Sequence, residues 1–128
     1  MREFKFRSYN KATEKMMPWE FISKVKNLHK LITLNHVEVM QFTGFKDSKG
    51  NDIYEGDILS DWTKTDEGLK QSFCQVFWNK PTGSWHLDLS DSQNKTYSIE
   101  LWIELHDYRY KVNGNVYETI TKERESSD

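Results

Sequence analysis

The stretch that decides the fold is residues 40–62, MQFTGFKDSKGNDIYEGDILSDW. Its apolar residues come in short groups separated by two polar turns, a pattern that predicts a strand, a turn, a short strand, a tight turn and a further strand. The second turn is centred on Gly56, which suits a backbone position that needs a positive φ. After this turn Ile58, Leu59 and Trp62 are expected to re-enter a core. The motif is architectural and carries no recognisable catalytic chemistry.

Upstream of this stretch the sequence predicts an arm made of a hairpin and a helix. Residues 3–9 alternate in the period-two pattern of a half-buried strand, and residues 16–17 are placed to return antiparallel to it. Pro18 suits the first position of a helix, because its missing N–H would have no partner there. Apolar residues at helical spacing then predict an amphipathic helix over residues 18–34. A stripe of this kind usually docks onto the core of its own domain; three of its members, Phe21, Val25 and Leu28, are candidate contact residues.

Downstream of residue 62 the chain predicts short strands separated by polar turns. Residues 73–78 and 84–89 alternate as strands, and residues 63–68 form a polar loop. Every odd position of residues 97–105 is apolar, which predicts another strand, with Trp102 as its one exception. Residues 113–114, Asn-Gly, are a dipeptide typical of hairpin turns. Several strands without alternating helices favour a barrel or sandwich.

Three pieces of the sequence together resemble the YopX family of phage and prophage proteins. They are residues 40–58 within the central stretch, the opening MREFKFR with the later residues 15–16, and GNVYE at residues 114–118. They occur in the family's order. The resemblance implies a small, intracellular, phage-encoded protein whose C-terminal part is similar to an SH3-like barrel. It implies no catalytic residues and no established biochemical role.

The pattern and the resemblance together predict a mainly β (α+β) protein with an N-terminal β-hairpin and amphipathic helix followed by an SH3-like barrel. The expected division is an arm at residues 1–35, a barrel at residues 36–120 and a disordered tail at residues 121–128. A chain of 128 residues is long enough to bury about two-thirds of its unfolded surface, so one real core is expected.

Composition restricts the compartment. The only cysteine is Cys74, so one chain cannot form an internal disulfide or a multi-thiolate metal site. Its alternation with neighbouring apolar residues predicts a buried, inert thiol. No apolar targeting segment follows Met1, and no apolar run approaches the roughly 20 residues needed to cross a bilayer. We therefore expect a protein of the host cell cytoplasm with no membrane partner.

No motif predicts an enzyme. The four histidines lack the i, i+4 spacing of a helical zinc site, and the carboxylates near the central turns fail the calcium-loop pattern because Asp52 stands where glycine is required. No phosphate loop, dinucleotide fingerprint or nucleophile elbow is present. The sequence thus predicts no catalytic residue, no metal and no cofactor.

Two functional interpretations remain open. Residues 1–30 have a charge balance of +5 and residues 31–128 one of −7. A basic arm packed on an acidic body, in the same or a neighbouring subunit, predicts a homo-oligomer that binds itself or a host or phage protein. A basic stripe suited to phosphate contacts predicts a nucleic-acid-binding module instead. The candidate residues are Arg2, Lys5, Arg7 and Tyr9 for the stripe, and Trp62, Trp85 and Trp102 for an exposed aromatic surface.

Overall fold

The computed structural model describes residues 3–89 and 97–118. Within these residues the chain forms, besides the helical residues 116–118, nine strands and three short helices. In chain order they are β1 (Phe6–Asn10), β2 (Lys15–Met17), α1 (Trp19–Ile22), α2 (Leu28–Ile32), β3 (Val37–Lys46), β4 (Asp52–Tyr54), β5 (Asp57–Thr65), β6 (Gly68–Asn79), β7 (Ser84–Asp88), β8 (Ser98–Glu100), α3 (Leu101–Asp107) and β9 (Lys111–Asn115).

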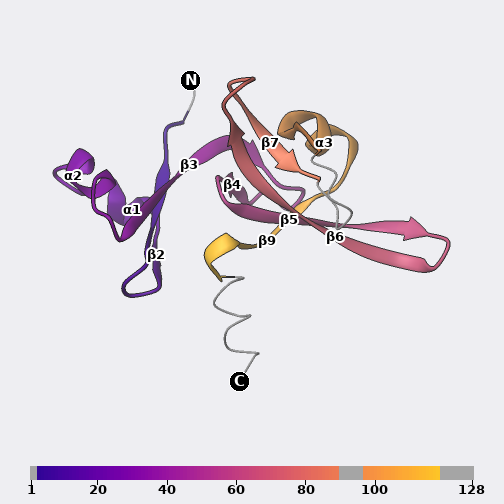
Figure 1. The fold of residues 1–128 in the computed structure, drawn as a ribbon, viewed down its shortest axis with the longest axis horizontal. Helices are drawn as coiled ribbons and strands as arrows, with labels where there is room; N and C mark the ends of the chain where they lie inside the picture. The colour runs from indigo at the N-terminus through magenta and orange to yellow at the C-terminus, as the bar shows by residue number, and fades with distance from the viewer. Residues whose placement is uncertain (1–2, 90–96, 119–128) are drawn as a thin grey trace.

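The strands make two antiparallel sheets, with strand orders β2-β1-β3-β4 and β8-β7-β6-β5-β9. Both sheets curl, and together they form a half-barrel (Figure 1). The predicted mainly β, barrel-like fold is confirmed. The predicted strand–turn–strand order of residues 40–62 is also confirmed, because β3, β4 and β5 follow one another there.

Strand β3 joins the arm to the barrel. Its first half pairs with β1 along five residue pairs, and its second half pairs with β4. The register shifts between Phe42 and Lys46, where Gly44 has a φ of 90°. The proposed division at residue 35 stays a prediction, but the pairing of β1 with β3 ties the two parts through backbone hydrogen bonds.

The main core joins the five-stranded sheet to β4 and α3. Leu59, Val76 and Leu87 of that sheet are fully buried together with Ile53 of β4 and Leu101 of α3. Cys74 and Tyr110 belong to the same cluster. The predicted buried position of the thiol is confirmed, and burial raises the pKa of Cys74 to about 11. The thiol is therefore protonated at neutral pH and is a poor nucleophile.

The single helix predicted over residues 18–34 is wrong. The structure has two helices, and α1 ends at Ile22 while α2 begins at Leu28. Asn27 explains the second start, because its side chain accepts a hydrogen bond from the backbone N–H of Lys30 as an N-cap. Ile22 is the member of the stripe that is fully buried, so the helical part of the arm buries one apolar residue completely rather than a continuous face.

The strand predicted over residues 97–105 is also wrong. Residues 98–100 form β8, but residues 101–107 form the helix α3. Leu101 and Glu104, three positions apart, are buried on one face of α3, and the hydroxyl of Tyr110 donates a hydrogen bond to the Glu104 carboxylate. The apolar residues that fitted a strand are therefore compatible with a helix that buries one face.

Residues 113–114 do not form a hairpin turn. They lie inside β9, which pairs with β5 on one side of the sheet. The register between the two strands shifts around them, between the Asp57–Asn115 and Leu59–Val112 pairs, and Gly114 has a φ of 84°. The dipeptide thus forms an irregularity within a strand. Such an irregularity, like a hairpin turn, can require a residue with a positive φ.

The polar loop predicted at residues 63–68 is mostly strand. Strands β5 and β6 continue as a regular hairpin as far as the Thr65–Gly68 pair. This hairpin projects well beyond the rest of the protein (Figure 1). Trp62 lies on the projecting part and is 54% exposed, so the expectation that it enters the core is wrong, whereas Leu59 is buried as predicted. The tail predicted at residues 121–128 lies outside the described residues.

Candidate interaction surfaces

The turn between β4 and β5 is held by a buried carboxylate. Gly56 reverses the chain with a φ of 85°, and Asp57 follows it with only 1% of its surface exposed. Asp57 accepts a hydrogen bond of 2.7 Å from the backbone N–H of Tyr54 and another of 2.7 Å from Nη2 of Arg7. The central sequence motif therefore forms a binding site, which we call the socket, for the side chain of Arg7 in β1.

Arg7 fills this socket. Its guanidinium lies 4.8 Å from the centre of the Tyr54 ring, and Nη2 also donates to the backbone oxygen of Glu55 at 3.3 Å. The Nε atom of Arg7 is buried and has no hydrogen-bond partner among the described residues. Burial raises the pKa of Asp57, and the charge and hydrogen bonds of Arg7 and Tyr54 oppose that shift. This is a buried ion pair between the arm and the barrel.

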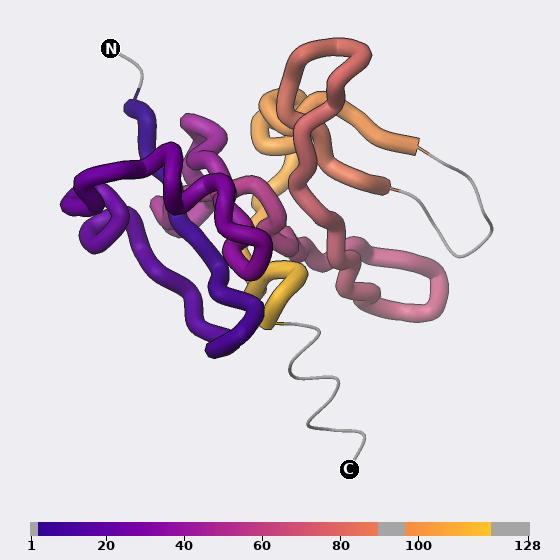
Figure 2. Tube along the Cα trace, turned by 60° about the vertical axis from the view of Figure 1, so that its left-hand side comes forward, coloured from indigo at the N-terminus to yellow at the C-terminus, as the bar shows by residue number. Residues whose placement is uncertain are grey.

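The other predicted residues of the basic stripe are also engaged within the chain. Lys5 donates to Asp52 at 2.6 Å, lies 3.1 Å from Glu3 and covers the Phe42 ring at 4.4 Å. Tyr9 is buried and stacks on Tyr117, with 4.3 Å between ring centres. Figure 2 shows the C-terminal end of the described chain, in yellow, beside the indigo N-terminal strands. Arg2 lies outside the described residues.

Acid stability is expected to depend on Asp47 and Asp52. Burial alone would raise the pKa of each, but the hydrogen bonds that each accepts, together with Lys5 and Lys46 beside Asp52, leave both values below the ordinary 3.8. A lowered pKa contributes stability that is present above pH 3.8 and lost as pH falls through the folded-state value.

The variant Asp52→Asn tests this expectation. Its loss of unfolding free energy relative to the unaltered protein is expected to be present at neutral pH and to shrink as pH falls below 3.8. Urea denaturation at several pH values measures the difference. A loss that is the same at every pH would contradict the role of the carboxylate charge.

The arm presents an apolar groove. Of the predicted stripe, Phe21 is 63% exposed, Val25 is exposed and Leu28 is half-buried. Phe21 borders a cavity of about 380 Å³ between the helices and the β1–β2 hairpin. We call this cavity the arm groove; its apolar lining residues are Met16, Met17, Pro18, Phe21, Leu31, Leu34 and Val37.

The three predicted tryptophans lie on different surfaces. Trp62 shares one face of the β5–β6 hairpin with exposed Leu69 and Phe73, by the register of the two strands. Trp102 is on α3, and its indole N–H donates to Glu100 at 2.7 Å. Trp85 is on β7, opposite Trp78. The structure therefore does not gather the three into one aromatic surface.

Trp85 is part of a cleft that the sequence did not predict. Trp78 and Trp85 face each other across the β6–β7 pair, with ring centres 4.9 Å apart and planes at 71°. They line a cavity of about 270 Å³ with Gln41 of β3 and Glu55 of the β4–β5 turn. We call it the tryptophan cleft. The sequence contained part of this information, because the strands predicted at residues 73–78 and 84–89 place Trp78 and Trp85 near their adjoining ends.

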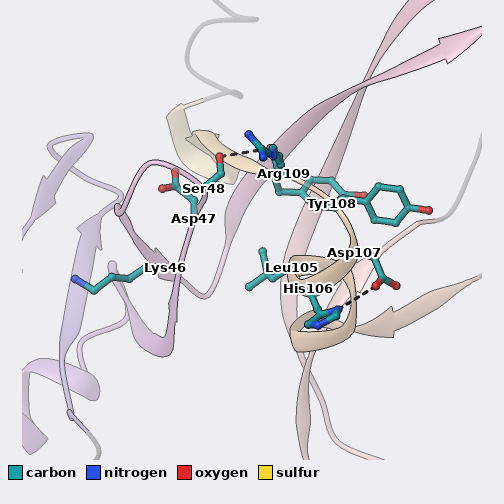
Figure 3. Close-up of a pocket in the computed structure, with 9 residues that line it drawn as sticks. Lys46, Asp47, Ser48, Leu105, His106, Asp107, Tyr108 and Arg109 are labelled. Carbon is teal, nitrogen blue, oxygen red and sulfur yellow. Dashed lines mark hydrogen bonds and ion pairs between the residues drawn. The ribbon is translucent and has the colours of Figure 1, made fainter.

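A polar pocket of about 280 Å³ lies between the β3–β4 turn and α3. Its side chains do not converge. In Figure 3 Lys46 and Tyr108 point outward in opposite directions, while His106 contacts its neighbour Asp107 at 3.2 Å. The pocket therefore offers no set of groups aimed at one ligand atom. The residues around it are Lys46, Asp47, Ser48, Leu105, His106, Asp107, Tyr108, Arg109 and Tyr110.

Within residues 3–89 and 97–118 no three histidine, cysteine, aspartate or glutamate side chains lie close enough to hold a metal ion together. Among the same residues, no helix has the length and apolar character that a membrane crossing requires.

Comparison with known proteins gives the family and supports the fold. No curated protein matches the sequence. The crystal structure of protein EF1440 from Enterococcus faecalis is similar with a TM-score of 0.61 and 18% sequence identity, over 92% of this chain and 96% of that one. At that identity the likeness concerns the fold. The family model described as YopX protein matches residues 5–121, which is nearly the whole chain, and the chain therefore belongs to the YopX family.

Proposed function

We propose that this protein is a non-enzymatic, phage- or prophage-encoded accessory protein of the host cytoplasm that acts by homo-oligomerisation and protein–protein interaction. The observation that carries the proposal is the arm groove. Phe21, Met17 and Leu34 border it and are all exposed, and contiguous exposed apolar surface of this kind marks interaction sites. Strand β2 is also an edge of its sheet, so backbone hydrogen-bonding groups are open beside the groove.

A second copy of the chain is the occupant that we propose for the arm groove. In a two-fold symmetric dimer the arm groove of one copy would contact the arm groove of the other, so Phe21 of both copies would be covered. The ion pairs of Arg7 and Lys5 join the arm to its own barrel, so the groove is presented at a fixed position. A fixed apolar surface loses little conformational freedom on association.

The competing function is nucleic-acid binding by the basic arm. Three residues that would serve it, Lys5, Arg7 and Tyr9, are committed to contacts within the chain. Exposed lysines of the arm such as Lys11 remain, and Lys11 lies 3.2 Å from Glu38. Salt separates the two functions, because phosphate contacts weaken steeply as salt rises and an apolar interface does not.

The test is size exclusion with light scattering at low and high salt, on protein purified with a nuclease step and on protein purified without one. The expected result is a discrete assembly whose mass is the same at both salt concentrations. The variant Phe21→Ser is expected to lower that mass to the monomer. The matched control Leu69→Ser removes an exposed apolar side chain from the β5–β6 hairpin and is expected to leave the mass unchanged.

Two results would contradict the proposal. One is a monomer at both salt concentrations. The other, seen when the nuclease step is omitted, is a monomer that carries nucleic acid until salt removes it, and this result would favour the competing function.

A further inference from the structure

The tryptophan cleft combines aromatic faces with polar groups that have few partners. The Glu55 carboxylate accepts one long hydrogen bond, of 3.4 Å from the backbone N–H of Gln41. Among the described residues no lysine, arginine or histidine pairs with it. The indole N–H groups of Trp78 and Trp85 likewise make no hydrogen bond within the part of the chain that the structure describes, and Trp78 is 44% exposed.

The charges around the cleft favour a cation. Burial raises the pKa of Glu55, the hydrogen bond from Gln41 opposes this shift, and the nearby charge of Glu38 adds to it. A positive group beside Glu55 would stabilise its charged form. A second cavity of about 220 Å³ shares Gln41 and Trp85 with the cleft and brings Glu3 and Lys46 to its rim. Lys46 lies 3.4 Å from Asp52, which partly neutralises that ammonium.

A guanidinium group fits this combination. It is planar and weakly hydrated, it stacks on aromatic faces, and its N–H donors match the two oxygens of a carboxylate. The cleft offers an indole face and a half-buried carboxylate from different elements, β6 and the β4–β5 turn, within one small cavity. A lysine ammonium would use the carboxylate but would gain less from the flat ring.

We propose that the tryptophan cleft binds an arginine side chain of a partner protein, with the guanidinium stacked on Trp78 and paired with Glu55. This site goes beyond the self-association proposed above, because its residues are separate from those of the arm groove. It gives the protein a second surface, selective for a basic side chain, that stays available when two arms associate.

The test uses the full chain labelled with ¹⁵N and the indole N–H signals of its five tryptophans. The probe is N-acetyl-arginine methylamide, and its control is N-acetyl-citrulline methylamide, which has nearly the same shape and no charge. The arginine probe is expected to shift the Trp78 and Trp85 signals saturably, and the citrulline probe is expected to shift neither. Equal shifts with both probes, or no saturable shift with arginine, would overturn the proposal.

Two variants and a matched control locate the binding. Glu55→Gln keeps an oxygen for the Gln41 N–H, so the fold is retained, and it is expected to weaken arginine binding about tenfold, the size of one charge-assisted contact. Trp78→Ala is expected to abolish the Trp85 shift. Trp102→Ala removes another exposed indole, from α3, and is expected to leave binding unchanged. Unaltered arginine binding in Glu55→Gln would also overturn the proposal, whatever mass that variant shows by light scattering.

Discussion

Replacing Arg7 by methionine is expected to lower the free energy of unfolding by about 3–5 kcal/mol, because removing one partner of a buried ion pair leaves the other charge uncompensated. Asp57 is the remaining partner, and its side chain is 1% exposed. Burial already raises the pKa of Asp57 despite the nearby guanidinium, which means that water stabilises its charged carboxylate only weakly. Urea denaturation followed by tryptophan fluorescence measures the loss.

Two further variants show whether the buried charge is the cause. Lys11→Met removes an arm cation whose pair with Glu38 is exposed, with 45% and 48% of the side chains accessible, and is expected to cost less than about 1 kcal/mol. The double variant Arg7→Met with Asp57→Asn removes both charges and keeps an acceptor for the Tyr54 N–H. It is expected to be more stable than Arg7→Met alone. A double variant that is less stable than the single one would assign the loss to packing.

Replacing Asp47 by alanine is expected to lower the free energy of unfolding by about 2–3 kcal/mol. A hydrogen bond to a charged group contributes about 1.5–3 kcal/mol, and of its three backbone donors water can replace the carboxylate at those of exposed Lys49 and Asn51. Asp47 is buried and accepts from the backbone N–H groups of Lys49, Asn51 and Val112 at 2.8 to 2.9 Å. The last of these bonds joins the β3–β4 turn to β9. Chemical denaturation gives the total loss, and faster hydrogen exchange at Val112 would report the broken connection.

The control for this variant is Asp66→Ala at the tip of the β5–β6 hairpin. Asp66 is exposed, and we expect a change within about 0.5 kcal/mol. If Asp47→Ala cost no more than Asp66→Ala, the hydrogen bonds of Asp47 would contribute nothing to the joining of turn and strand.

The sequence was most informative where local chemistry decides the structure. Gly56 adopts the positive φ that its turn required, and the apolar groups on either side of it form β3 and β5 as predicted. The alternation around Cys74 also predicted a buried strand position correctly. In these segments the period of the apolar residues and the demands of the turn point to the same structure.

The sequence failed where one pattern fits two structures. Apolar residues at positions 101 and 105 suit both a strand and one face of a helix, and the structure has the helix α3. Trp102 was the informative exception, because an apolar residue out of phase with a strand lies on the solvent side of the helix, where it is 54% exposed. In the arm, Asn27 caps a second helix inside a periodic stripe, and the period alone does not show the break.

The candidate sites could be predicted only in part, because they depend on contacts between distant residues. The opposite charge balance of arm and body is consistent with the ion pairs that Lys5 and Arg7 make with the barrel. It could not show that Arg7 reaches Asp57, so the same residues also fitted a phosphate-binding stripe. The tryptophan cleft combines Gln41 and Glu55 with a hairpin more than twenty residues later, and no local pattern encodes that meeting.

The stacking of Tyr9 on Tyr117 has a consequence for how the protein is made. Tyr9 lies in β1 and Tyr117 among the helical residues 116–118, at opposite ends of the described chain. This contact therefore raises the contact order of the fold, and folds with many distant contacts form slowly. During synthesis the N-terminal strand emerges early and waits for almost the whole chain before its aromatic neighbour exists. A nascent chain arrested before Tyr117 would therefore hold its first strand more loosely than the finished protein does.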